Sequence, residues 1–384
     1  MSLGGACTSF ALAGKMLQLL MDLEIATRTI NNKTVALGTE LKQEQDIQAD
    51  AHASRDLTAK PNQAEPAVPI ACVEVDGGRI QTRTVGLGAG VHDPHWRESK
   101  NAGFYRMIGD SFVDDPHPTL PSCFSSRKQM SGLLTGLEKE LPEATAPAPK
   151  PDFSWRPKSV YRTCLASLCN SDRFGQLMSA EAEQRGFYSA HRAAFLGDGL
   201  PYNWTIQQTH FKSFTPILDF IHPIEHLHSL SRSLWDDGDE AWEHCQKWIE
   251  LCWRGDVIEV IGLLEAEQMA RDEISESVPE DDPRRLLAET LGYLRNNASR
   301  MDYPAYRREG LPTTSCLIES QVKEMNHRVK GSEKFWNDGE SGESILHVRA
   351  ALISDTNKLS EHIRTRPGSY YTRSSSKNRE TAIT

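Results

Sequence analysis

The sequence has no apolar run approaching the roughly 20 residues that a membrane-spanning helix needs. Of its 384 residues, 38% are hydrophobic and 25% are charged, which is typical of a soluble globular protein with two or three structural units. In the apolar stretch 1–23 the first positive charge, Lys15, follows a small apolar run, whereas a signal peptide has the reverse order. We therefore expect no membrane partner, and we predict that this stretch begins the folded protein.

Paired cysteines and an excess of positive charge are also missing. The eight cysteines are scattered singly without a CxxC pair, whereas zinc knuckles and disulfide frameworks use tighter spacing. Reduced thiols in a cytoplasm are the simpler interpretation. The net charge of -10 gives no global attraction to nucleic acid, so any DNA-binding surface must be local.

Hydrophobic periodicity and composition divide the chain into an α/β core interrupted by helices. Two helices within residues 8–50 are compatible with a helix-turn-helix remnant, or equally with a helical hairpin that packs on the next domain. The predicted units are a helical N-terminal segment (1–50), a linker (51–68), the first part of the core (69–222), a helical insertion (223–298), the remainder of the core (299–354) and a polar, disordered tail (355–384).

Within the first part of the core, the stretch 67–88 alternates in hydrophobicity. It predicts two strands joined in a hairpin through Asp76-Gly77-Gly78. Residues 101–112 predict a further strand, and the Pro- and Ala-rich stretch 138–159 predicts an extended linker or surface loop. A short strand at 193–196 then leads into Gly-Asp-Gly and a new helix.

Three acids stand in apolar surroundings. Asp76 and Asp198 each follow an apolar strand, and Glu319 is flanked by Leu317, Ile318 and Val322 on a predicted helix. Taken singly, the two aspartates are better explained as turn or helix-capping residues, and Glu319 equally well as a solvated helix position. If the three meet at one rim of a sheet, their repulsion calls for a hard divalent cation, and carboxylate oxygens suit Mg²⁺ or Mn²⁺.

A family resemblance strengthens this interpretation. The blocks ACVEVDGGRIQTR, HWRESKNAGFYRM, FLGDGLPYNW, ILDFIHPIEHL and RMDYPAYRREGLPTTSCLIESQVKEMNHRVKGSEKFW occur in order. They resemble bacterial insertion-sequence transposases of the DDE type, specifically the ISKra-type group. The resemblance implies an RNase H-like mixed sheet flanked by helices, with an all-helical insertion between the second and third catalytic acids. Asp76, Asp198 and Glu319 would then be the three metal-binding acids, holding Mg²⁺ or Mn²⁺ as two ions.

The resemblance also implies partners and further site residues. Double-stranded DNA, at the element ends and the target, would be the substrate in a bacterial, nucleoid-associated protein, and a homo-oligomer on DNA is left open. Asp219 and His222 match a D-x-x-H element that implies a place for His222 near the scissile phosphate; a structural histidine is nearly as good an explanation.

Basic and aromatic residues near the third acid supply candidates for contacts with DNA. Arg328 and Lys330 are the candidates for phosphate binding, and Trp336, Tyr303 or Trp204 could stack on bases. Surface ion pairs are the ordinary alternative for the basic residues.

Transposases of this type usually begin with a longer DNA-binding region that often carries cysteine pairs, and this chain shows none. Two alternatives therefore stay open beside an active transposase. One is a truncated or inactive transposase-derived DNA-binding protein without catalysis, and the other is a nuclease of the same fold acting outside transposition.

Overall fold

The computed structural model describes residues 1–55, 68–83, 95–130, 155–236, 238–271, 279, 282–330, 334–337, 340–366 and 369. Strands in this part of the chain are β1 (Ile70–Arg83), β2 (His95–Ile108), β3 (Lys158–Ser167), β4 (Arg192–Gly197), β5 (Thr215–Leu218) and β6 (Trp336–Asn337). Its helices are α1 (Ser2–Cys7), α2 (Phe10–Met21), α3 (Thr27–Ala53), α4 (Ser122–Ser125), α6 (Ser171–Gln184), α7 (Pro201–His210), α8 (Ile221–Trp235), α9 (Asp239–Trp253), α10 (Val257–Met269), α11 (Pro283–Asn297), α12 (Tyr303–Arg308), α13 (Cys316–Val329), α14 (Glu340–Ile353) and α15 (Lys358–Thr365), with short 3₁₀ turns η1 (Phe187–Ser189) and η2 (Ala298–Arg300). None of these described helices combines the length and apolar character needed to span a bilayer.

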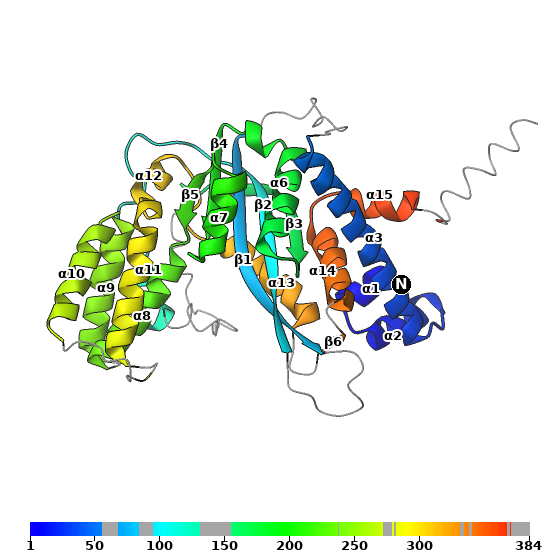
Figure 1. Ribbon diagram of the computed structural model, residues 1–384, viewed down its shortest axis with the longest axis horizontal. Coiled ribbons are helices and arrows are strands. Elements are labelled where there is room, and N and C mark those ends of the chain that lie inside the picture. Colours follow the sequence, from blue (N-terminus) through cyan, green and yellow to red (C-terminus); the bar gives the residue numbers. More distant parts are fainter. Residues whose placement is uncertain are drawn as a thin grey trace, which may run out of the picture.

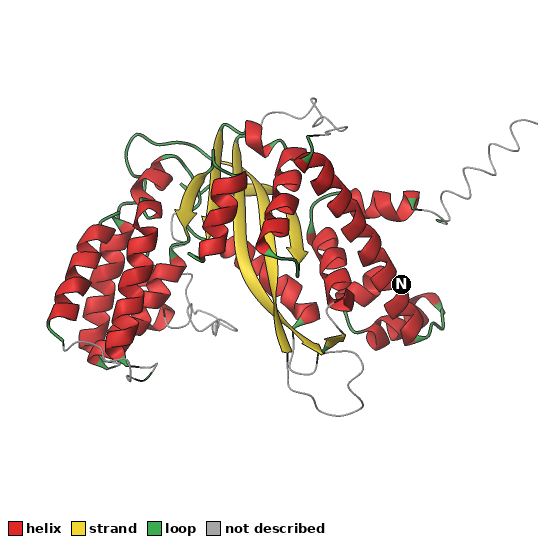
Figure 2. Ribbon diagram, in the orientation of Figure 1, coloured by secondary structure: helices red, strands yellow, loops and turns green. Residues whose placement is uncertain are grey.

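A mixed sheet with the strand order β3-β2-β1-β4-β5 forms the centre of the molecule (Figure 2). The pairs β1–β2 and β2–β3 are antiparallel, whereas β1–β4 and β4–β5 are parallel, and β6 pairs with the far end of β1. Parallel neighbours need a crossover, which is supplied by the helices between them. The predicted α/β class, with a mixed sheet flanked by helices, is confirmed.

The predicted hairpin at Asp76-Gly77-Gly78 is wrong, because β1 continues through these residues as one 14-residue strand. Asp76 pairs with Asn101, Gly77 with Lys100 and Gly78 with Ser99 on β2. A Cβ atom on Gly78 would lie 2.6 Å from Ser99 Oγ. A side chain at this position would therefore displace the Ser99 hydroxyl of β2, and the glycine lies in a strand, not in a turn.

The stretch assigned to a linker at 138–159 overlaps the start of β3, which begins at Lys158. The sequence analysis missed this edge strand, because the proline-rich composition before it dominates the pattern. The rest of the predicted linker up to residue 154 lies outside the described residues.

Two groups of helices lie beyond the two edges of the sheet, while α6, α7 and α13 pack over the sheet itself (Figure 1). Helices α8–α11 lie beyond β5, and α1–α3 lie with α14 beyond β3. Polar side chains begin several of these helices: Ser9 accepts a hydrogen bond from Leu12 N, Asn170 from Arg173 N, and Asp282 from Arg284 N. Such caps satisfy backbone N–H groups that have no partner within the helix.

Two predicted boundaries change. Helix α3 extends to Ala53, into the predicted linker, whose residues 56–67 lie outside the described part. Helix α15 lies within the tail predicted to be disordered, because His362 hydrogen-bonds to Glu40 and Glu44 of α3. Most of the tail beyond residue 366 is likewise outside the described part.

Candidate active site

Three aspartates lie level with one another across the parallel strands: Asp76 within β1, Asp198 directly after β4 and Asp219 directly after β5. The register pairs Glu74 with Leu196 and Gly197 with Leu218. Continued outward, the same offsets bring Asp76 level with Asp198, and Asp198 level with Asp219. Adjacent strands are about 4.8 Å apart, and level residues of parallel strands point to the same face. The sheet therefore presents these aspartates side by side.

Helix α13 carries Glu319 to the same edge. Asp219 Oδ1 accepts a hydrogen bond from Ser315 N at 2.7 Å, and Glu74 Oε2 accepts one from Ile318 N at 2.9 Å. These donors belong to the start of the helix, where backbone N–H groups lack helical partners and attract negative charge. The helix is thus anchored to β1 and to the end of β5, and Glu319 lies in its first turn. We call Glu74, Asp76, Asp198, Asp219 and Glu319 the carboxylate edge.

Glu74 is a further acid of this edge that was not predicted from the sequence. It lies two residues before Asp76 on β1, so both side chains face α13, and it is fully buried. Burial raises the pKa of Glu74 to about 8, and the nearby Asp219 carboxylate acts in the same direction. The available signal was an acid inside an otherwise apolar strand, in the order Cys72, Val73, Glu74, Val75.

Burial and neighbouring charges also raise the pKa values of two further acids of the edge, Asp76 and Glu319. Burial raises the pKa of Asp76 to about 6; the charges of Asp198 and Glu319 contribute, while His222 and the Gly77 N–H oppose them. Burial and the charge of Asp219 also raise the pKa of Glu319. The three acids predicted from sequence therefore lie close enough to influence one another. A buried cluster of like charges is unfavourable unless a cation or protons neutralise it.

His222 supplies a positive charge beside this edge. Its Nδ1–H donates to Asp219 Oδ2 at 2.7 Å. Although burial acts in the opposite direction, the Asp219 hydrogen bond and charge raise the pKa of His222 to about 9. The imidazole is therefore protonated at neutral pH. Because Nδ1–H already donates to Asp219, the second ring donor, Nε2–H, can donate to a bound ligand. A phosphate oxygen would accept that hydrogen bond.

Oxygen donors for a divalent cation are present, but they are not yet gathered around one point. Asp198 Oδ1 accepts hydrogen bonds from Leu200 N at 2.9 Å and from Asn203 Nδ2 at 2.8 Å. Within the described part of the chain, no three His, Cys, Asp or Glu side chains form a group that could hold a metal ion.

Arg328 does not lie where a DNA phosphate could reach it. Its side chain is buried, its Nε–H donates to Gly5 O at 2.9 Å, and its guanidinium lies between the rings of Phe10 and Trp336. The proposed DNA contact is therefore corrected to a structural contact between α13 and the N-terminal helices. Lys330, at the end of α13, is exposed and stays a candidate for phosphate binding.

The three aromatic residues proposed to stack on bases are also buried. Trp336 Nε1–H donates to Val329 O, Trp204 Nε1–H donates to Asn297 Oδ1, and Tyr303 packs against Phe220. Because the protein itself covers these rings, they pack in its core and do not present a surface on which a base could stack.

No protein-family model matches this chain, and no curated protein sequence matches it either. The interpretation of the carboxylate edge therefore rests on its own geometry and electrostatics.

Proposed function

We propose that the protein is a metal-dependent DNA transposase of the DDE type, which cleaves DNA strands and joins the freed 3′ ends to a target. The observation that carries this proposal is the row of Asp76, Asp198 and Asp219 on three adjacent strands, with Glu319 delivered to it by an anchored helix. The strand order, with β1 central, antiparallel to β2 and parallel to β4, supports an RNase H-like core.

The donor set fits Mg²⁺ or Mn²⁺. These ions prefer carboxylate oxygens, and a divalent cation would stabilise the charged forms of Asp76 and Glu319, whose pKa values are raised by burial and, to a smaller extent, by neighbouring carboxylates. Asp76, Asp198 and Glu319 would hold the metal. Bound there, it would lower the pKa of an attacking water or 3′-hydroxyl and stabilise the leaving oxygen.

The protein's own residues would position the DNA. The protonated His222 would donate its Nε2–H to a non-bridging oxygen of the scissile phosphate, with Asp219 fixing the ring orientation. Asn203 would orient Asp198 through the hydrogen bond to its Oδ1. Lys330 would contact the DNA backbone farther along α13.

The test is strand cleavage of duplex oligonucleotides copied from the DNA that flanks the gene, with Mg²⁺ or Mn²⁺. Asp76→Asn and Asp198→Asn should each lower the cleavage rate by roughly 10³-fold, because metal stabilisation of the transition state amounts to several kcal/mol. Asp282→Asn is the matched control: it caps α11 and Asn caps equally well, so its cleavage rate should be that of the unaltered protein.

Two outcomes would contradict the proposal. Undiminished cleavage by Asp76→Asn would show that the carboxylate edge is not the catalytic centre. Retention of the duplex in a gel shift, with no cleavage under any metal condition, would indicate a non-catalytic DNA-binding protein instead.

A further inference from the structure

A hollow of about 710 Å³ opens directly beside the carboxylate edge. It lies among α7, α8, α11 and the η2 turn, and it shares Asp198 and His222 with the candidate active site. A group bound in the hollow would therefore lie next to any phosphate held at the edge. Its volume exceeds that of a single nucleobase several-fold, so a base with its sugar fits.

One wall of the hollow is a fixed aromatic surface. The His226 and Tyr293 rings stack at 4.0 Å between centroids with 27° between their planes. The Tyr293 hydroxyl donates to the Asp198 backbone oxygen at 2.9 Å. A direct hydrogen bond thus ties the stacked pair to the backbone of a predicted metal ligand. Neither ring is fully buried.

The rest of the lining is largely apolar, through Leu200, Pro201 and Trp204, and a few polar and charged side chains stand among these residues. Arg300 lies over the Trp204 ring at 4.4 Å and donates to Asn296 O at 2.8 Å. The side chains of Gln208 and Asn296 are exposed at the rim, and each amide both donates and accepts hydrogen bonds. A flat aromatic surface with amides and one guanidinium suits a heteroaromatic ring with polar edges. A purely apolar or polyanionic ligand would leave these groups poorly matched.

We propose that this hollow receives one nucleobase, unstacked from the DNA strand whose phosphate lies at the carboxylate edge. The inference rests on the proposed function, because it takes that strand as the substrate. Proteins read or hold an extruded base by stacking it on aromatic side chains and bonding its polar edge, and aromatic stacking accepts any of the four bases. The base would lie against the His226–Tyr293 pair, with Gln208 and Asn296 at its edge.

The test is photochemical cross-linking of a mixed-sequence single-stranded oligonucleotide that carries 5-iodouracil at successive positions. Ca²⁺ replaces Mg²⁺, so that the measurement does not depend on cleavage. Peptide mapping should place cross-links at His226 or Tyr293. His226→Ala should lower their yield roughly tenfold, within the range measured for loss of one base-stacking side chain. His226→Phe, which restores a stacking ring, should recover most of the yield.

His244→Ala is the matched control. His244 also stacks on an aromatic ring, that of Trp235 at 3.8 Å, in the same group of helices but outside the hollow. Its cross-link yield should equal that of the unaltered protein. Cross-links that map elsewhere, or that persist undiminished in His226→Ala, would overturn the proposed base site.

Failure of this inference is distinguishable from failure of the proposed function. If Asp76→Asn abolishes cleavage while His226→Ala leaves cross-linking unchanged, the hollow is not a base site and the proposed transposase activity is unaffected. If His226 governs cross-linking while Asp76→Asn cleaves normally, the hollow binds bases and the catalytic assignment fails.

Discussion

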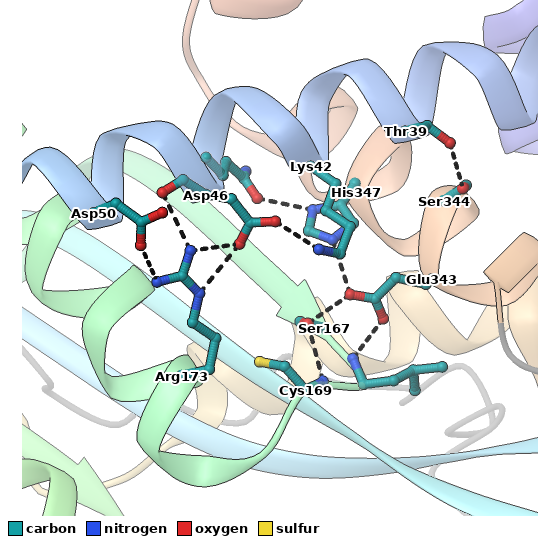
Figure 3. Close-up of polar contacts among 12 residues, drawn as sticks. Thr39, Lys42, Asp46, Asp50, Ser167, Cys169, Arg173, Glu343, Ser344 and His347 are labelled. Atoms are coloured by element: carbon teal, nitrogen blue, oxygen red, sulfur yellow. Dashed lines mark hydrogen bonds and ion pairs between the residues drawn. The ribbon is translucent and has the colours of Figure 1, made fainter.

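Two clusters of acidic side chains in the described part of the chain differ in how many cationic partners they have. In the layer formed by α3, α6 and α14, Arg173 donates to Asp46 at 2.8 Å and to Asp50 at 2.6 Å, and Lys42 donates to Asp46 at 2.6 Å (Figure 3). At the carboxylate edge, five acids share the single positive charge of His222 as their only hydrogen-bonded cationic partner among the described residues.

Glu343 shows how completely an acid in this layer is satisfied. Its Oε1 accepts from Ser167 Oγ at 2.6 Å and is joined to His347 Nε2 at 3.0 Å, while its Oε2 accepts from Leu168 N at 2.6 Å (Figure 3). Although burial alone would raise the pKa of Glu343, these hydrogen bonds lower it. For Glu181, burial is likewise outweighed by Lys358 and Arg185, and its pKa falls to about 2.

The opposite pKa shifts distinguish two uses of buried acids. Acids with lowered pKa values stabilise the fold in their charged form, because their partners are already in place. Acids with raised pKa values at the edge destabilise the folded state whenever they are charged. Buried acids with raised pKa values are typical of sites that bind a ligand or catalyse a reaction. The contrast can be tested by removing one acid from each place.

Glu343→Ala should give the largest loss of stability. It leaves the Leu168 N–H, the Ser167 hydroxyl and His347 without their buried acceptor. We expect the free energy of unfolding to fall by roughly 3 kcal/mol, the usual cost of breaking a buried, hydrogen-bonded pair. Urea unfolding followed by circular dichroism measures it.

Glu343→Gln serves as the matched control, because the amide oxygen still accepts one of these hydrogen bonds. Its loss should be about half as large. Equal losses in the two variants would show that packing, and not hydrogen bonding, is the main contribution of this side chain.

Glu74→Gln should change stability in the opposite direction, and the change should depend on pH. The pKa of Glu74 is about 8 in the folded protein against an ordinary value of 4.5, so between these values the folded state keeps a proton that the unfolded state has lost. The free energy of unfolding therefore falls as pH rises, by up to about 1.4 kcal/mol per pH unit. Glutamine does not titrate, so the variant should gain stability relative to the unaltered protein from pH 5 to pH 8 in metal-free buffer.

Glu343 provides the reverse comparison. Its lowered pKa means that its contribution is present above the ordinary pKa and is lost as pH falls through the folded value. The difference between Glu343→Gln and the unaltered protein should thus shrink towards acid pH. If the Glu74→Gln difference were constant between pH 5 and pH 8, Glu74 would not be a protonated acid in the fold.

The residues show why the sequence predicted part of this site and missed the rest. Asp76 and Asp198 each follow a short apolar run in the sequence, and this is a local signal, although β1 continues past Asp76. The role of Glu74 depends on Ile318, 244 residues away, and no local pattern reports that contact. The Asp-Gly-Gly stretch is typical of turns, but pairing with β2 outweighed that preference. Helical spacing likewise could not show that the partner of Arg328 is Gly5.

The smallest expected effect concerns two basic residues two positions apart near the end of α13. Lys330→Ala should weaken binding of any duplex about threefold at 0.15 M salt and reduce the salt dependence by about one counterion, because one phosphate contact is lost. Arg328→Ala should leave the affinity unchanged and lower the free energy of unfolding instead, since its guanidinium is enclosed by Phe10 and Trp336. Fluorescence anisotropy across a salt series measures the first variant, and urea unfolding the second. If Arg328→Ala and Lys330→Ala lost equal DNA affinity, Arg328 would have to leave its buried position when DNA binds. Arg328 would then be a DNA contact and not a structural residue.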